Sequence, residues 1–229
     1  LTNWRNGLPG HGVDSLLHIN GTNFILRDSE IGNTGKAWNS ETPDGDTHGV
    51  YVQASNALIE DNYFYNTDGY AVHPYGGAAK ISNTIIRNNY ILRPGRSDTS
   101  SMAGSLSAGD DNQIYDNVVV LDNDSTHSVG IEVGYSSART KIYNNTVAKR
   151  TGGACAINFD FGTQTLSEYV NNIDYPTCTN ALVGTPATNS NNRTTDPTYT
   201  DYATDDLTLA SGSAAIGAGT TSIRGCNGT

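Results

Sequence analysis

The stretch Asn56–Thr67, NALIEDNYFYNT, decides the fold because it repeats the stretch Asn23–Thr34, NFILRDSEIGNT, at a constant offset of 33 residues. Shorter copies of the pattern follow at 84–92, 112–120, 140–147 and 168–173. A unit of this length with short apolar runs cannot bury its apolar face alone, whereas stacked copies share one continuous core. The sequence therefore predicts an all-β fold, a single right-handed parallel β-helix (solenoid) of about six coils.

A polar residue recurs at the same place in each copy, in the series Ser29, Asn62, Asn89, Asn117, Asn145 and Asn172. We expect these residues to lie at a bend between strands, where Asn tolerates a left-handed conformation. The amide of each Asn can then bond the equivalent amide one coil away. Because such stacking satisfies the amides completely, a structural ladder is favoured over a set of ligands.

The composition fits many short strands joined by turns better than it fits helices. The 229 residues include 25 Gly, and only 16% are charged, a profile typical of β-rich proteins. We expect one domain, with the coils over residues 1–179. The C-terminal segment, 180–229, is expected to be irregular and to pack on the solenoid or cap its last coil.

The charge balance limits the classes of partner. The chain has 23 acidic and 13 basic residues and a net charge of −10, so it lacks the basic footprint of a nucleic-acid binder. No apolar stretch is long enough to cross a membrane, and no membrane insertion is expected. The start at Leu1 without Met suggests a processed product. Cys155 and Cys178 can pair across adjacent coils, or these residues and Cys226 can be buried thiols.

A second motif, a small residue followed by apolar-x-apolar, precedes the bends, as in GVYV at Gly49–Val52. Alternation places Val50 and Val52 inside and Tyr51 outside. Stacking the copies predicts an outward column of His18, Tyr51, His73, Ser105, Glu132 and Asn158. The flanking columns are Asn20, Gln53, Tyr75, Ser107, Gly134 and Asp160 on one side, and Ser15, His48, Tyr70, Met102 and Val129 on the other. A shift of one residue would exchange Ser105 for Leu106, and this alternative stays open.

The patterns HGVYV at 48–52, IEDNY at 59–63 and GYAVHPY at 69–75 closely resemble the pectate-lyase-like right-handed β-helix superfamily. The segment 196–219 looks like the tail that closes many secreted members. The resemblance covers nearly the whole chain and implies a secreted or cell-surface protein, with an active groove along one outward sheet face. It does not select a chemistry, because the superfamily includes lyases, hydrolases, epimerases, adhesins and structural fibres.

We expect the outward column to bind a polysaccharide or glycan, since aromatic faces stack on sugar rings and Tyr and His can transfer protons. If the protein is an enzyme, His73 is the expected base, Tyr51 its acid partner and Glu132 the residue that orients substrate. The expected substrate-binding residues are His18, Gln53, Tyr70, Tyr75, Asn158 and Asp160. The alternative is a plain cross-strand ladder that stabilises the sheet without a substrate.

Two reaction classes make different demands on the charged residues. Lyases of this superfamily usually neutralise the uronate carboxylate with Ca²⁺ or with Arg and Lys. This chain has six basic residues that could take this role, but they lie outside the outward column and are expected to be solvated loop charges. They are Lys80, Arg87, Arg93, Arg96, Arg139 and Lys141. A hydrolase needs two carboxylates, for which Glu132 and Asp160 are the candidate pair.

A calcium site is a further hypothesis. Asp46 and Asp68 each lie three residues before the small residue that opens a strand, so they should stack in neighbouring coils. Ca²⁺ prefers several oxygen ligands, which carboxylates and turn carbonyls supply. The alternative is that both are ordinary turn residues.

A second class of function is also open. An uncapped first coil would expose strand edges and could stack on another subunit. The chain would then be a non-catalytic structural or adhesive solenoid that assembles end to end into a fibre or surface array.

Overall fold

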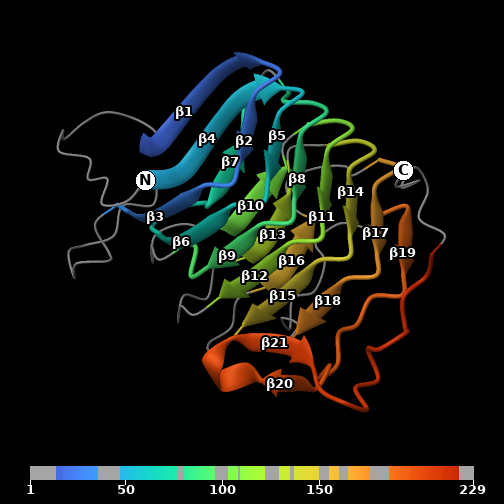
Figure 1. Cartoon of the computed structure of the whole chain (residues 1–229). Coiled ribbons are helices and arrows are strands. Elements are labelled where there is room, and N and C mark those ends of the chain that lie inside the picture. Colours follow the sequence, from blue (N-terminus) through green and yellow to red (C-terminus); the bar gives the residue numbers. More distant parts are fainter. Residues whose placement is uncertain are drawn as a thin grey trace.

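The computed structural model describes residues 14–35, 47–76, 80–95, 103–107, 109–121, 129–134, 137–149, 155–159, 165–175 and 186–221, with the backbone alone for residues 14, 103–107 and 155–159. These residues form an all-β structure built on three parallel sheets (Figure 1). No α-helix occurs in the described ranges, and the helical element among them is the 3₁₀ turn η2 (Tyr202–Thr204).

Each sheet collects strands from along the whole chain. Sheet 1 has the order β1 (Asp14–Thr22), β4 (Thr47–Ser55), β7 (Val72–Pro74), β10 (Ala103–Ser107), β13 (Val129–Val133) and β16 (Cys155–Phe159). Sheet 2 has the order β2 (Ile25–Arg27), β5 (Leu58–Glu60), β8 (Ile85–Arg87), β11 (Gln113–Tyr115), β14 (Lys141–Tyr143), β17 (Glu168–Val170) and β19 (Thr188–Ser190). Sheet 3 has the order β3 (Glu30–Thr34), β6 (Tyr63–Thr67), β9 (Tyr90–Leu92), β12 (Val118–Leu121), β15 (Thr146–Lys149) and β18 (Ile173–Tyr175).

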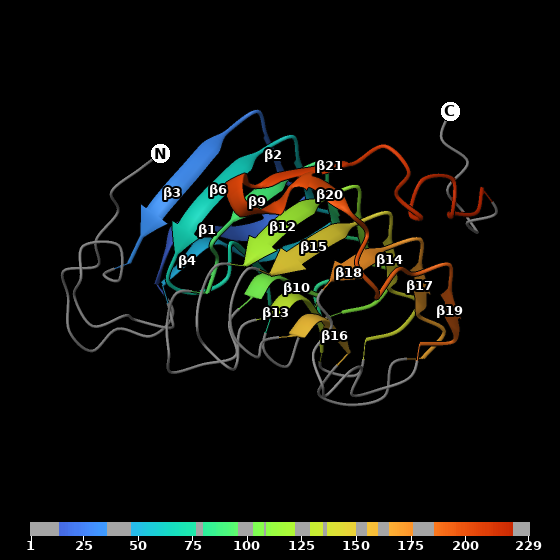
Figure 2. The same cartoon turned by 90° about the horizontal axis from the view of Figure 1, so that it is seen from below.

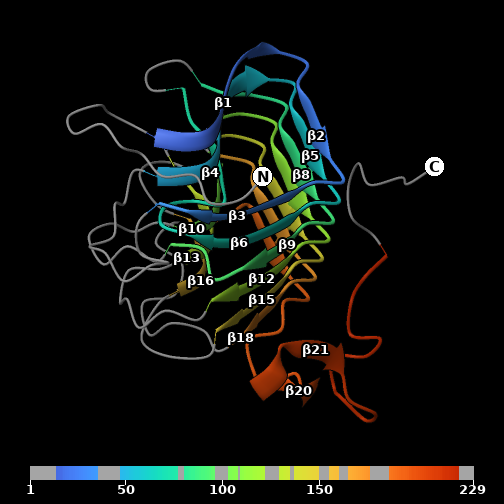
Figure 3. The ribbon, with the colours of Figure 1, turned by 60° about the vertical axis from the view of Figure 1, so that its left-hand side comes forward.

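The chain visits the three sheets in turn. It passes from β1 to β2 to β3 and returns to sheet 1 with β4, and each later round up to β18 adds one strand to each sheet, after which β19 extends sheet 2 alone. Figure 3 shows corresponding strands, such as β2, β5 and β8, lying side by side along the molecule. Strand alternation explains the core, because Val50, Ile59 and Phe64 have no exposed surface and point inward from the three sheets. This arrangement is consistent with the predicted parallel β-helix.

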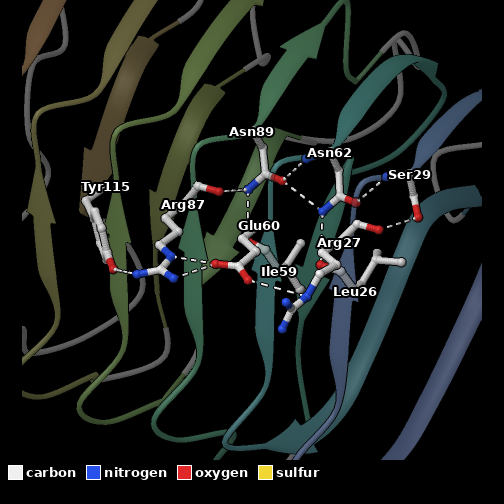
Figure 4. Close-up of polar contacts among 9 residues, drawn as sticks. All are labelled: Leu26, Arg27, Ser29, Ile59, Glu60, Asn62, Arg87, Asn89 and Tyr115. Carbon is white, nitrogen blue, oxygen red and sulfur yellow. Dashed lines mark hydrogen bonds and ion pairs between the residues drawn. The ribbon is translucent and has the colours of Figure 1, made fainter.

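The predicted asparagine ladder is confirmed, and Figure 4 shows its first members, with Asn62 bonded to Asn89. The Nδ2 of each ladder Asn donates to the Oδ1 of the next, at 3.0 Å from Asn62 to Asn89 and 3.0 Å from Asn89 to Asn117. The Oδ1 of Asn117 also accepts from the backbone N–H of Asn89 at 3.0 Å. These side chains are buried at the bends between sheets 2 and 3, and their bonds fasten neighbouring rounds to one another.

The left-handed residue at this bend is the one before the ladder Asn, which differs from the prediction. Positive φ angles occur at Asp61 (57°), Asn88 (54°) and Asp116 (54°), whereas the ladder residues Asn89 and Asn117 have none. Asn and Asp tolerate this conformation better than other residues with a Cβ, which explains the polar pair in each copy. The first member turns the chain, and the second makes the hydrogen bonds.

The segment predicted as a tail begins by continuing sheet 2. Strand β19 pairs with β17, and Asn192 accepts from Asn172 Nδ2 at 2.9 Å. The chain then forms an antiparallel hairpin of β20 (Tyr199–Asp201) and β21 (Asp206–Leu209), which lies beside sheet 3 in Figure 2. The Tyr202 hydroxyl, in the turn of this hairpin, donates to the carbonyl of Lys149 in β15. The ladder thus extends beyond residue 179, and the hairpin packs on the parallel sheets.

Candidate functional site

The predicted outward column of sheet 1 forms at its first three positions. His18 in β1 is the backbone partner of Tyr51 in β4, and Tyr51 is the partner of His73 in β7. Further along the sheet, Glu132 in β13 is the partner of Asn158 in β16. Figure 1 shows β1, β4 and β7 as neighbours. Parallel pairing therefore brings together residues that are far apart in the sequence.

The β10 position of this column is Leu106, and the prediction of Ser105 is wrong. Ser105 pairs with Val72 and Ile131, whereas Leu106 pairs with Glu132. Val72 and Ile131 are core residues without exposed surface, so Ser105 takes a core register position. Since successive residues of a strand face opposite sides, one step of register exchanges the two faces.

The same step changes both flanking columns at β10. Ser107 pairs with Val133, so it does not share a column with Gly134 as predicted. Ala103, and not Met102, pairs with Val129.

Five side chains gather on the face of sheet 1 opposite the core, and we call them the histidine–tyrosine cluster: His48, Tyr51, Tyr70, His73 and Glu132. The His73 ring lies edge-on to His48 at 4.2 Å between centroids and edge-on to Tyr51 at 4.9 Å. It stacks on Tyr70 at 4.4 Å with an interplanar angle of 29°. His73 is therefore the centre of the cluster.

Two hydrogen bonds hold the cluster together. The backbone N–H of Tyr70 donates to Nδ1 of His48 at 3.0 Å, so the lone pair of that nitrogen is occupied. The Tyr70 hydroxyl donates to Oε2 of Glu132, which reaches it from β13 across the position of β10. Glu132 thus contacts Tyr70, and its predicted role of orienting a substrate directly is not tested by this contact.

The cluster is buried, which the sequence did not predict. The exposed fraction is 8% for His73, 6% for Tyr70 and 2% for Glu132. Three other predicted binding residues lie at its edge, where His18 is exposed and Gln53 and Tyr75 are half-buried. His18 Nε2 lies 3.1 Å from Gln53 Oε1, and the Tyr75 ring stacks on His73 at 5.5 Å. The cluster therefore has a buried interior and a more exposed polar rim, and its five side chains do not form an open groove.

Burial sets the protonation states of the cluster. It lowers the pKa of His48 to about 3 and, together with the charge of His48, holds the pKa of His73 well below its usual range. Burial also raises the pKa of Tyr51. At neutral pH both imidazoles are therefore uncharged and Tyr51 keeps its proton. These are the forms that a general base and a general acid require, although the low pKa weakens His73 as a base.

One polar atom of the cluster has no partner among the described residues. Nδ1 of His73 is buried and makes no hydrogen bond there. A buried nitrogen without a partner costs free energy, about 1–3 kcal/mol, unless a water or ligand supplies the bond. This atom is the clearest local signal for a bound group in the cluster.

The predicted calcium residues are only partly described. Asp46 lies outside the described residues. Asp68 is fully buried and packs against Gly35, where an added Cβ would lie 2.3 Å from its Oδ2. In the part of the chain that the structure describes, no group of three or more His, Cys, Asp or Glu side chains is placed to hold a metal ion.

Several other predicted residues also lie outside the description. Asp160, Arg96, Cys178 and Cys226 are not among the described residues, and for Asn158 and Cys155 the backbone alone is described. The proposed Glu132–Asp160 carboxylate pair and any disulfide therefore remain predictions.

Arg87 belongs to a strand, and its interpretation as a solvated loop charge is wrong. It lies on β8 and donates to Glu60 Oε2 through Nε at 2.8 Å and through Nη2 at 2.5 Å (Figure 4). Its Nη1 donates to the Tyr115 hydroxyl at 2.8 Å, and Arg27 approaches Glu60 from the other side at 3.5 Å. The bonds to Tyr115 and Glu60 raise the pKa of Arg87. This row ties four rounds together on the outer face of sheet 2.

Sheet 2 also carries a surface hollow that the sequence did not predict. The hollow has a volume of about 510 Å³, and its lining includes Gln113, Lys141, Glu168 and Arg139. Arg139 is engaged by Asp111 at 2.6 Å through Nε. Lys141 and Glu168 occupy paired positions on β14 and β17. The available signal was a polar residue at the first position of the last four sheet 2 strands, namely Gln113, Lys141, Glu168 and Thr188.

Comparison with known proteins adds no assignment, since no family model, curated protein or solved structure matches this chain significantly. Within the described residues, no helix has the length and apolar character needed to cross a membrane.

Proposed function

We propose that the three sheets belong to one right-handed parallel β-helix of about six coils, of the pectate-lyase-like type. The support is the return of the chain to sheets 1, 2 and 3 in each of the rounds from β1 to β18, together with the ladder at equivalent bends. Right-handed crossover is the strong rule for parallel strands joined in this way.

We further propose that this β-helix is an extracellular protein, secreted or at the cell surface, that binds or processes polysaccharide through the face of sheet 1. The observation that carries the proposal is the histidine–tyrosine cluster. The ring centroid of His73 lies 4.2–4.9 Å from the ring centroids of three aromatic or imidazole neighbours. The buried Nδ1 of His73 has no hydrogen-bond partner among the described residues. Neutral His73 beside protonated Tyr51 is a base and acid pair within one site.

In a lyase-type reaction His73 would accept the proton from the sugar carbon next to the carboxylate. The electron pair of that C–H bond would form the new double bond as the glycosidic C–O bond breaks, and Tyr51 would protonate the leaving oxygen. An epimerase would use the same proton abstraction, leave the glycosidic C–O bond intact and return a proton to the opposite face of that carbon. A hydrolase would use Glu132 and a second carboxylate in place of this pair.

The test is a screen of the purified protein on acidic and neutral polysaccharides, with and without calcium. Product is measured as unsaturated uronate absorbance and as new reducing ends. His73→Ala and Tyr51→Phe should abolish product formation while the circular dichroism spectrum is unchanged. Tyr115→Phe is the matched control, because it removes a hydroxyl from sheet 2 and should retain activity. No product and no binding on the whole panel would reject the proposal.

A structural or adhesive role is the second candidate, and one observation favours it. The inward residues of the first round, including Leu17, Phe24 and Leu26, are only partly buried, whereas Val50 and Ile59 one round later have no exposed surface. This end of the core would be completed by a second copy stacked end to end. Sedimentation over a range of concentrations tests it, since filament growth is expected and a monomer at every concentration contradicts it.

A further inference from the structure

Three tyrosines form an aromatic surface on sheet 3, away from the histidine–tyrosine cluster, and we call Tyr63, Tyr65 and Tyr90 the tyrosine platform. Phe64 and Ile91, which alternate with them in β6 and β9, are buried in the core, so the platform points outward. Tyr63 is the backbone partner of Tyr90. The platform therefore spans two rounds of the chain.

The rings are arranged as a stepped surface. Tyr63 stacks on Tyr65 at 5.1 Å between centroids with an interplanar angle of 24°, and it lies 5.8 Å from Tyr90 at 56°. Tyr63 is 38% exposed, and its two neighbours are half-buried. The outer side of this aromatic surface is open to solvent, and the buried core lies directly beneath it. Such a surface is available for stacking on a ligand.

The local backbone explains why Tyr65 lies flat. Gly32 in β3 is the partner of Tyr65, and a Cβ added at Gly32 would lie 2.4 Å from the Tyr65 ring. The absence of a side chain at Gly32 therefore lets the ring rest on the neighbouring strand. The Tyr65 ring is held by this contact before any ligand binds, which limits the entropy that binding costs.

The charges around the platform are mixed. Partial burial raises the pKa of Tyr63, the charge of Arg93 lowers it, and the charges of Glu30 and Asp205 raise it. Burial and a hydrogen bond with Glu30 raise the pKa of Tyr65. Two carboxylates and one guanidinium thus surround the rings, and the whole chain has a net charge of −10. This field disfavours a polyanion, whereas carboxylates and a guanidinium can hydrogen-bond to sugar hydroxyls.

We propose that the tyrosine platform binds a neutral oligosaccharide, with pyranose C–H faces stacked on Tyr63 and its neighbours and hydroxyl groups bonded to the flanking charged residues. A uronate chain is disfavoured by the same local charges. The platform uses none of the side chains of the histidine–tyrosine cluster and lies on another sheet, so it can hold sugar whether or not the cluster is catalytic.

The test is titration calorimetry of the full chain with cello-, xylo- and manno-oligosaccharides, and with oligogalacturonate as the charged probe. We expect at least one neutral probe to bind. Tyr63→Ala should weaken this binding about tenfold, because it removes one aromatic contact with the sugar. Tyr63→Phe keeps the ring and should bind within about twofold of the parent. Leu166→Ala, at a 61% exposed apolar residue elsewhere, is the matched control and should leave affinity unchanged.

The proposal is overturned if every neutral probe fails to bind, if oligogalacturonate is preferred, or if Tyr63→Ala leaves the affinity unchanged. Concentration-dependent association that Tyr63→Ala abolishes would identify the platform as a contact between copies, which also overturns it. His73→Ala separates the two sites, because it should leave calorimetric binding intact even where it abolishes turnover. If Tyr63→Ala does not fold, Tyr90→Ala replaces it with the same expected weakening.

Discussion

Replacement of Asn117 tests the ladder where it is most complete. Its Nδ2 lies within hydrogen-bond distance of the carbonyls of Ile86 (2.9 Å) and Tyr115 (3.0 Å) and of Asn145 Oδ1 (3.0 Å). Its Oδ1 accepts from the backbone N–H and the Nδ2 of Asn89, both at 3.0 Å. With 2% of its surface exposed, Asn117 has little water to replace these bonds.

The magnitude follows from the groups left behind. Asn117→Ala breaks two ladder steps, the one from Asn89 and the one to Asn145, and each buried group left unpaired costs about 1–3 kcal/mol. After partial relaxation we expect a loss of about 4 kcal/mol in the free energy of unfolding, a large share of the roughly 5–15 kcal/mol of a typical domain. Asn117→Asp should be worse at pH 7 than at pH 4, because an ionised carboxylate would face carbonyl oxygens in the core, and protonation restores one donor.

Urea unfolding followed by circular dichroism measures the loss, and hydrogen exchange at the amide of Asn89 locates it. Asn20→Ala is the matched control, since Asn20 is exposed on β1 and should change stability by less than about 0.5 kcal/mol. Two results would refute the role given to the ladder. One is a loss of unfolding free energy in Asn117→Ala that lies within about 1 kcal/mol of the loss in the control. The other is unchanged protection of the Asn89 amide.

Three further changes have defined outcomes. Ser29→Asn should raise the urea midpoint and add about 0.5–1 kcal/mol, because its amide can donate to Asn62 Oδ1, which now accepts from the Ser29 backbone N–H. Burial raises the pKa of Asp174 to about 7, so its ionisation favours the unfolded chain as pH rises from about 4 to 7. Asp174→Asn should therefore gain stability relative to the parent over that range, by up to about 4 kcal/mol, and a pH-independent difference between the two urea curves would contradict this. Gly109→Ala should cost at least about 3 kcal/mol in thermal or urea unfolding, because the new Cβ would lie 1.8 Å from the carbonyl oxygen of Ile81, and an unchanged midpoint would contradict the close packing.

The sequence predicted the repeating architecture well because two periodic signals agree. Alternation of apolar residues assigned Val50 and Val52 to the core, and both are fully buried. The recurring Asn predicted stacked bends, and Asn62 and Asn89 are bonded in that way. The ladder member Asn192 was not predicted, because its step from Asn172 is 20 residues where earlier steps were 27 to 33.

The candidate site was predicted as a set of neighbours, but its environment was not. Equal offsets along the chain were enough to place His18, Tyr51 and His73 in one row. The burial of His73, and the bond from Tyr70 to Glu132 across the position of β10, depend on how side chains from different rounds pack. No pattern along the sequence contains that information.

By itself the sequence determined the strands, the ladder and the order in which residues stack, because these depend on local alternation and on near-equal repeat lengths. The tertiary structure alone decided the register at Ser105 and Leu106, since a single step exchanges the two faces of a strand without changing its alternation. It also decided which outward side chains are buried and which, like Tyr63, remain open, because solvent exposure depends on every segment that packs against a surface.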